Sequence, residues 1–511
     1  IPPLAWLLKS LPFLQPYSIA LLHLGIFFSY ILCAHFVFLI LKRFNVQSWF
    51  AAWAAICIMA LQPQTNRITG HFALSFAFFI PLSWYLLLRF LETPNKKWAV
   101  ISSTNILIWF FVHVYTGMII TLFYLTYFLV RMIRERNKSL NVSVLGISVS
   151  LIPALIFFLF MKATDPVHDR PVDPYGFFVY TASYETVLVP SKPPLRHMMS
   201  QIIKVRKQEW EGLSYIGAST ILILLISSLN NFRRRFLVKS SEDQEERPLL
   251  CIHRHFLAAS VVLLFLSFGF PFNWFPDFLK YIEPLKQFRA LGRFAWVFYY
   301  TSTVIATVLL HGWAYKQRSN RKLALFIQCF SFIFLGLNIV EAVPMQQDFR
   351  NDNLKPNVFE ESLLTTEQLQ MVEQARKADV QAILPLPYFH LGTDILVKRA
   401  SEEVIRNSFL LSRYTGKPIF SCMMSRTSIG QTKQFMQAFV PDGVHKPIRE
   451  KMKDCKNLLV YHRKKEQLLP EEKIVLSRAI SFHTASDYEL LILPMDSLFK
   501  KDESFTLKNF R

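Results

Sequence analysis

The chain has 511 residues, of which 52% are hydrophobic and 15% are aromatic. The hydrophobic residues gather into long runs in the first two thirds of the chain, whereas the last third has the composition of a water-soluble domain. The net charge of +21 is not accompanied by a nucleic-acid-binding motif, and membrane proteins concentrate Lys and Arg in their cytoplasmic loops. We therefore predict a polytopic α-helical membrane protein and argue against nucleic acid as a partner.

Ten apolar runs predict about ten transmembrane helices. They are Ser18–Leu41, Trp49–Leu61, Phe72–Leu88, Trp98–Phe111, Met118–Val130, Leu140–Phe160, Leu213–Leu229, Phe256–Phe270, Phe294–Leu310 and Leu323–Val343. Several are shorter than the ~20 residues of a straight crossing, so we expect those helices to continue into irregular turns. The sequence thus predicts a transmembrane domain over residues 1–343, with a long outer loop over 162–212, and a soluble α/β domain over 344–511.

Basic residues alternate between successive loops. The basic loops carry Lys42-Arg43, Arg89 with Lys96-Lys97, Arg131 with Arg134, Arg136 and Lys138, Arg233-Arg234-Arg235, and Lys316 with Arg318, Arg321 and Lys322. The positive-inside rule makes these loops cytoplasmic. The remaining loops and the C-terminal domain then lie on the extracytoplasmic, periplasmic side of an inner (cytoplasmic) membrane, and membrane lipids are expected partners.

The N-terminal residues Ile1–Tyr17 would lie outside the membrane, before the first helix. They contain neither an initiator Met nor a signal peptide. We expect that the chain lacks at least one N-terminal helix and part of the first outer loop.

Two polar turns interrupt the apolar runs on the predicted outer side. Gln62–His71 separates the second and third runs, and His113-Val114-Tyr115 separates the fourth and fifth. Polar residues at such breaks usually face protein or an aqueous cavity rather than lipid. His71 is a candidate base or substrate-orienting residue, with an interfacial histidine bonded to backbone as the alternative. His113 and Tyr115 are candidate substrate-binding residues.

The long outer loop opens with a cluster of acidic residues and a histidine between prolines. Asp165, His168 and Asp169 carry oxygen and nitrogen ligands that suit Mg²⁺ or Mn²⁺. The alternative is a solvated loop stiffened by its prolines. The first interpretation makes a divalent cation, Mg²⁺ or Mn²⁺, a candidate cofactor.

The same loop ends in Glu211 and Tyr215, which lie four residues apart at the start of an apolar run. Helical spacing would place the two side chains on one face, and Tyr215 is a candidate residue for binding the substrate or its lipid phosphate. A carboxylate at a membrane surface is costly enough to indicate a role, either catalytic, or in binding a sugar hydroxyl, or in pairing with an arginine.

Arg289 and Arg293 stand on one short turn before the ninth apolar run. The planar guanidinium group matches phosphate oxygens, so the pair is a candidate clamp for a lipid phosphate. The alternatives are ion pairs with Glu211 or Glu283, or simple anchoring of the helix end.

Four short motifs and the general layout resemble one superfamily. The motifs are Gly70-His71, the H-x-Y turn at His113 and Tyr115, E-G-x-x-Y-x-G from Glu211 to Gly217, and R-x-x-G-R from Arg289 to Arg293. Together with the order of helices and the outer C-terminal domain, they are similar to the bacterial integral-membrane glycosyltransferases of the GT-C superfamily.

This resemblance implies a transferase that takes a sugar from a polyprenyl-phosphate donor to a cell-envelope glycan, lipid or protein on the outer face of the membrane. Arg289 and Arg293 match the basic residues that bind the lipid phosphate in that superfamily. The superfamily's acidic residue in the first outer loop has no counterpart in Ile1–Tyr17, so either the catalytic acid lies upstream of Ile1 or the analogy fails. A flippase or transporter of lipid-linked saccharides and a non-catalytic envelope-assembly protein are the alternatives.

The C-terminal domain alternates apolar strand patterns with helical ones. Strands are expected at Val380–Leu386, Asn457–Tyr461 and Glu489–Leu493, and helices at Thr366–Ala378, Ser428–Phe439 and Pro470–Ala479. This alternation predicts a small α/β layer that either binds an acceptor glycan or supports the membrane domain without chemistry of its own.

Overall fold

The computed structural model describes residues 2–135, 140–202, 204–206, 208–237, 247–316, 321–358, 360–392, 396–424, 427–441, 444–452 and 456–498. The chain forms two compact units, which we call the helical unit (residues 1–164 and 175–354) and the strand unit (residues 165–174 and 355–511). Arg136, Lys138 and Arg318 of the predicted basic loops lie outside the described residues.

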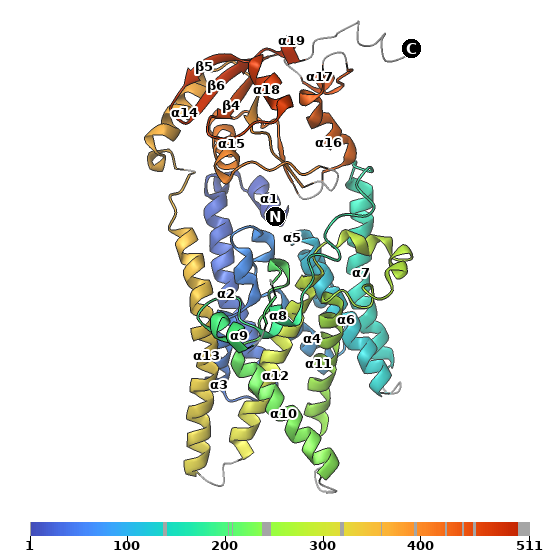
Figure 1. Cartoon of the computed structure of the whole chain (residues 1–511). Coiled ribbons are helices and arrows are strands. Elements are labelled where there is room, and N and C mark those ends of the chain that lie inside the picture. Colours follow the sequence, from blue (N-terminus) through green and yellow to red (C-terminus); the bar gives the residue numbers. More distant parts are fainter. Residues whose placement is uncertain are drawn as a thin grey trace. The chain divides into compact units, whose positions relative to one another are not determined.

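Each of the ten apolar runs overlaps a helix of the helical unit (Figure 1). These helices are α2 (Ser18–Arg43), α3 (Ser48–Ala60), α4 (Phe79–Glu92), α5 (Lys96–Val112), α6 (Val114–Glu135), α7 (Leu140–Thr164), α10 (Ala218–Leu237), α11 (Arg247–Ser267), α12 (Ala295–Lys316) and α13 (Arg321–Asn353). The short helices α1 (Pro2–Ser10), α8 (Tyr184–Leu188) and α9 (Leu195–Ile202) lie outside these runs.

Within the described residues, six helical segments are long and apolar enough to cross a membrane. They are Pro12–Arg43, Phe72–Glu92, Val114–Glu135, Leu140–Thr164, Leu291–Ala314 and Leu325–Asn353. Ala218–Asn230 and Arg254–Ser267 are apolar but shorter. The chain is therefore a membrane protein by the length and composition of its helices. The six segments found in the described ranges do not confirm the predicted number of about ten transmembrane helices.

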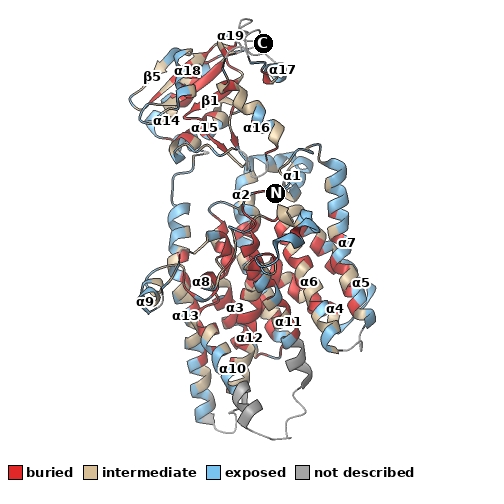
Figure 2. Ribbon diagram, turned by 45° about the vertical axis from the view of Figure 1, so that its right-hand side comes forward, coloured by how far each residue is buried: buried red, intermediate tan, exposed pale blue. Residues whose placement is uncertain are grey.

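The distribution of apolar side chains fits a lipid environment. Buried residues gather in the middle of the helical unit, whereas α7 and α13 present exposed faces (Figure 2). Those faces carry large apolar side chains such as Phe158, which is 56% exposed, and Ile333, which is 69% exposed. Contiguous apolar surface of this kind is rare on soluble monomers and is the ordinary outer surface of a membrane protein.

The two ends of the helical unit differ in chemistry. The C-terminal ends of α2, α6, α10 and α12 lie at one end of the unit (Figure 1). Lys42 and Arg43 close α2 there, and Arg134 lies in the last turn of α6. Short 3₁₀ turns form at the opposite ends of the helices: η2 (Pro63–Arg67) follows α3, and η7 (Leu291–Phe294) precedes α12.

The strand unit is built on a four-stranded sheet in the order β1-β4-β6-β5. β1 (Ala382–Leu386) is parallel to β4 (Leu458–Arg463), which is antiparallel to β6 (Tyr488–Leu493), and β6 is antiparallel to β5 (Ile480–Thr484). A second, two-stranded sheet pairs β2 (His390–Leu391) with β3 (Cys422–Met423).

Helices surround these strands, as the alternating pattern predicts. They are α14 (Thr366–Lys377), α15 (Glu402–Thr415), α16 (Ile429–Met436), α17 (Ile448–Lys451), α18 (Pro470–Ser477) and α19 (Met495–Leu498). Val372 of α14 and Val404 of α15 pack with Ile383 and Leu459 of the sheet in one apolar core.

The boundaries of the two units differ from those predicted. Helix α13 continues past residue 343 to Asn353, so the change of unit falls after Leu354. Residues 165–174 of the long loop also belong to the strand unit, where Asp169 accepts a hydrogen bond from the Gly430 N–H at 2.6 Å.

Candidate functional site

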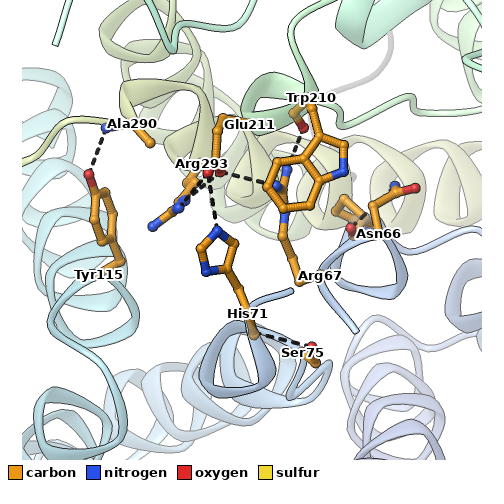
Figure 3. Close-up of polar contacts among 10 residues, drawn as sticks. Asn66, Arg67, His71, Ser75, Tyr115, Trp210, Glu211, Ala290 and Arg293 are labelled. Carbon is orange, nitrogen blue, oxygen red and sulfur yellow. Dashed lines mark hydrogen bonds and ion pairs between the residues drawn. The ribbon is translucent and has the colours of Figure 1, made fainter. Parts of the chain in front are cut away.

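Three basic side chains converge on the carboxylate of Glu211 (Figure 3). Arg293 approaches it with two parallel bonds, from Nε to Oε2 and from Nη2 to Oε1, each of 2.8 Å. Arg67 donates from Nη1 to Oε2 at 3.0 Å, and His71 Nε2 lies 3.6 Å from Oε1. The paired bonds of Arg293 are the strong, geometrically specific form of an arginine–carboxylate contact.

The Arg67–Glu211–Arg293 cluster is buried and carries excess positive charge. Its three residues are 0%, 8% and 6% exposed, in that order. Two guanidinium groups face one carboxylate, and guanidinium remains protonated in proteins, so the cluster has a formal charge of +1. The Nε of Arg67 is also a buried donor without a partner among the described residues. A dry site with a surplus cation and an unused donor is suited to an anion.

Electrostatics keep Glu211 ionised. Burial by itself would favour the neutral acid, but the nearby His71, the hydrogen bonds from Arg293 and the charges of Arg293 and Arg67 outweigh it and hold the pKa of Glu211 well below its usual range. Burial lowers the pKa of Arg67 to about 10, partly offset by Glu211, so Arg67 is still charged at neutral pH.

Arg67 is fixed at the end of η2 by backbone and aromatic contacts. The turn begins with Gln62, whose side chain accepts a bond from the Gln64 N–H at 2.7 Å. Arg67 Nη2 donates to the carbonyl of Trp210 at 2.6 Å, and its guanidinium stands 4.0 Å from the Trp210 ring centre. Stacking on an aromatic face stabilises a desolvated cation.

Tyr115 positions the turn that carries Arg293. Its ring lies 4.3 Å from the Arg293 guanidinium, and its hydroxyl accepts the Ala290 N–H at 2.6 Å. The ring also meets Phe288 edge-on, with 5.2 Å between ring centres. Since Tyr115 is only 8% exposed, these contacts indicate a residue that positions Arg293.

Two glycines bring the Glu211 and Arg293 turns into contact. A Cβ on Gly292 would stand 2.6 Å from the Gly212 Cα, and one on Gly212 would stand 2.6 Å from the Thr181 carbonyl oxygen. The Gly292 N–H donates to the Tyr180 carbonyl at 2.9 Å in the same region. Only residues without a side chain fit such a backbone crossing, which explains the glycine in each of the two motifs.

His113 is neutral at physiological pH. Its Nδ1 accepts the Tyr115 N–H at 3.1 Å, which places the proton on Nε2 in the neutral ring. Burial, reinforced by the nearby charge of Arg293, lowers the pKa of His113 to about 3. His113 therefore adds polarity but no positive charge beside the cluster.

The structure brings together only part of the predicted set. His71, Glu211 and Arg293 meet, with His113 and Tyr115 beside them. Arg289 is half-buried just before the turn that carries Arg293, and Arg293 forms the paired bonds with Glu211. The alternative of an ion pair between Glu211 and an arginine is thus observed.

The predicted helical pairing of Glu211 with Tyr215 is wrong. Glu211 lies in the 3₁₀ turn η4 (Trp210–Gly212), and α10 begins only at Ala218, so the two side chains do not share a helix face. The hydroxyl of Tyr215 instead donates to Oε1 of Glu341 at 3.2 Å.

The predicted metal ligands have other partners. Asp165 pairs with Arg170, Asp169 accepts the Gly430 N–H, and His168 is exposed. Within the described ranges, no group of three or more His, Cys, Asp or Glu side chains is arranged to hold a metal ion. A Mg²⁺ or Mn²⁺ cofactor stays a prediction without support from this geometry.

Sequence reasoning missed Arg67 and Trp210 as members of the site. Both were visible as polar or aromatic residues in predicted outer loops, yet 143 positions separate them along the chain. Arg67 could have been found from its place in the polar turn that ends at His71, because that turn is too polar to face lipid.

The fold and the buried cluster define a polytopic helical membrane protein with a candidate anion site. The chain belongs to the family described as Domain of unknown function (DUF6311), which matches residues 1–332 and so includes Arg67, Glu211 and Arg293. No curated protein of known function matches the chain.

Proposed function

We propose that this protein is a membrane glycosyltransferase that takes a sugar from a polyprenyl-phosphate donor and transfers it to a cell-envelope glycan, lipid or protein. The observation that carries the proposal is the formal charge of +1 in the buried Arg67–Glu211–Arg293 cluster. A phosphate-bearing membrane lipid supplies both the missing negative charge and the oxygen acceptors that guanidinium groups prefer.

The position of the cluster supports a lipid donor at the outer face. Its turns lie at the ends of the helices opposite to the basic ends of α2 and α6. The positive-inside rule favours a cytoplasmic position for the basic ends, which supports placing the cluster on the extracytoplasmic side of a cytoplasmic membrane in this proposal.

The proposed roles divide between binding and proton transfer. Glu211 is held ionised by two arginines and so orients them, because a carboxylate with a pKa far below neutral is a weak base. His71 is the candidate proton acceptor, since its side chain is 42% exposed and lies beside Glu211. The ion pairs of Glu211 with its two arginines equally favour a second candidate function. This is a flippase, which would bind the same phosphate without transferring a sugar.

The proposal is tested by phosphate-dependent binding. The full chain in lipid nanodiscs is titrated with a polyprenyl phosphate and with the uncharged polyprenol of equal length. We expect the phosphate to bind at least tenfold more tightly, and Arg293→Gln to remove most of that difference, because hydrogen bonds to charged groups are worth about 10- to 100-fold in affinity.

Arg89→Gln is the matched control, because it deletes one arginine from a partly exposed ion pair with Glu92 in the last turn of α4, outside the cluster. Equal affinity for the phosphate and the alcohol, or equal losses in the two variants, would contradict the anion site. The enzyme is supported if the wild type transfers radiolabelled sugar from the donor and His71→Gln loses that transfer but still binds phosphate. The flippase is supported if the wild type binds the phosphate and transfers no sugar.

A further inference from the structure

A second polar site lies in the helical unit, with charge opposite to that of the cluster. A pocket of about 300 Å³ opens between α10, α13 and the segment 190–195. Most of its walls are apolar, including Leu61, Leu213, Leu337 and Met345. This volume is at the lower end of the range for small-molecule sites, about 300–1,000 Å³.

One carboxylate of the apolar part of α13 reaches this pocket. Glu341 lies within the segment Leu325–Asn353, which is long and apolar enough to cross a membrane. Its oxygens accept the Ala218 N–H at 3.2 and 3.3 Å and the Tyr215 hydroxyl at 3.2 Å. Among the described side chains, no Lys, Arg or His forms an ion pair with it. An ionised carboxylate within a membrane-spanning segment is costly unless a cation meets it.

The remaining charges at the pocket do not supply that cation. Lys192 lines the pocket but pairs with Asp348, so Lys192, Asp348 and Glu341 together carry a formal charge of −1. The hydrogen bond from Ala218 caps the first turn of α10, where the helix dipole favours an anion. That bond partly stabilises the carboxylate and leaves its net charge in place.

We propose that the pocket binds the ammonium group of an amphiphilic amine, with Glu341 as its counter-ion and the apolar walls around its carbon chain. The ring of Tyr215 lines the same pocket beside Glu341, and an aromatic face attracts an ammonium group. An inorganic divalent cation fits less well, because it requires about six oxygen ligands and Glu341 is the one carboxylate of the pocket lining. This proposal is independent of the proposed transferase function.

The test compares three water-soluble probes of one chain length. Hexylammonium, hexanol and hexanoate are titrated into the full chain in nanodiscs by isothermal calorimetry at neutral pH. We expect hexylammonium to bind most tightly and Glu341→Gln to weaken its binding about 10- to 100-fold, because that variant removes a charge-assisted hydrogen bond. Hexanol should bind the wild type and Glu341→Gln equally.

Glu341→Gln keeps an oxygen that can accept the Ala218 N–H, so the cap of α10 is preserved. Glu92→Gln is the charge-matched control, because Glu92 pairs with Arg43 and Arg89 away from the pocket lining. Tyr215→Phe retains the ring and should retain binding, whereas Tyr215→Leu should weaken it. The source of the amine is found by measuring hexylammonium affinity in nanodiscs of phosphatidylethanolamine and of phosphatidylglycerol. Weaker binding in phosphatidylethanolamine means that its headgroup competes for the pocket and is the source of the amine. Equal affinity in the two lipids means that the natural ligand is a free amine.

Two outcomes overturn the proposal. Equal affinities for hexylammonium and hexanol would mean that the pocket recognises only the carbon chain. Unchanged hexylammonium binding in Glu341→Gln would mean that Glu341 serves only as the cap of α10.

Discussion

In the helical unit, Arg67, Glu211 and Arg293 pair inside the protein, whereas in the strand unit Arg376 and Glu361 pair at the surface with side chains 42% and 45% exposed. Both pairings have distances near 2.9 Å, so distance alone does not separate them. The difference is burial and balance: the surface pair is matched one to one, and the buried cluster has two cations for one anion. Burial and unbalanced charge therefore predict that the cluster contributes more to stability than the surface pair and that it can bind an anion.

The largest expected effect comes from neutralising the buried carboxylate. Glu211→Gln leaves Arg67 and Arg293 as two uncompensated buried cations, and removing one partner of a buried pair costs about 3–5 kcal/mol. Chemical unfolding of the full chain in detergent should report a loss of that size. A loss below about 1 kcal/mol would mean that water reaches the cluster and that the contrast with the surface pair is false.

Acid should destabilise the helical unit through His113. Its pKa is about 3 in the folded protein and about 6.5 when unfolded, so below pH 6.5 the unfolded state takes up the proton and the folded state does not. The contribution of neutral His113 is complete above pH 6.5 and is lost as the pH falls towards 3; at pH 5 the loss is about 2 kcal/mol.

The comparison with His113→Gln isolates this effect from other titrating groups. Gln cannot be protonated, so the stability of that variant should fall less between pH 7 and pH 5 than that of the wild type. Parallel pH profiles for the two proteins would show that His113 is protonated in the folded state and that the surroundings of Arg293 are wetter than the structure indicates.

A smaller effect is expected at the start of α14 in the strand unit. Thr365 accepts the Gln368 N–H at 3.2 Å, and the Gln368 side chain accepts the Thr365 N–H at 3.1 Å, which is a reciprocal cap. Thr365→Ala removes one of these bonds and should cost about 1 kcal/mol, measured by denaturant unfolding of the full chain. Thr365→Ser keeps the acceptor and should be near wild type.

The smallest effect is expected at the surface pair itself. Glu361→Gln breaks the contact with Arg376, but water solvates both groups in the variant. The unfolding midpoint should not change measurably, at low or at high salt. A clear drop would show that the exposed pair resembles the buried cluster after all.

The helices and most strands were predicted well because the pattern of apolar residues along the sequence indicates them. The apolar runs located the long helices that the structure describes in the helical unit, and the strand patterns at Val380–Leu386, Asn457–Tyr461 and Glu489–Leu493 match β1, β4 and β6. β5 was missed, because its residues are largely exposed and lack the apolar pattern of a buried strand. Helix α15 was not predicted.

The candidate site was predicted only in part, because it is made of turns. Arg293, Glu211 and His71 were predicted from residue type and membrane side. They lie together, with the ion pair between Glu211 and an arginine that was one of the alternatives. Tyr215 was misplaced because a helical spacing was applied to a segment that forms a 3₁₀ turn and an extended stretch before Ala218. Arg67 is held in the site by a tertiary contact with Trp210, and no local sequence pattern predicts such a contact.

The crossing of Gly212 and Gly292 has a consequence for binding kinetics. Since the two backbones touch, the turns that carry Glu211 and Arg293 have no room to slide past each other. A ligand therefore meets donors that are already in place, and little conformational entropy is lost when it binds. For such a rigid site, weakening variants of the cluster should act by shortening the residence time of the ligand, with the association rate almost unchanged.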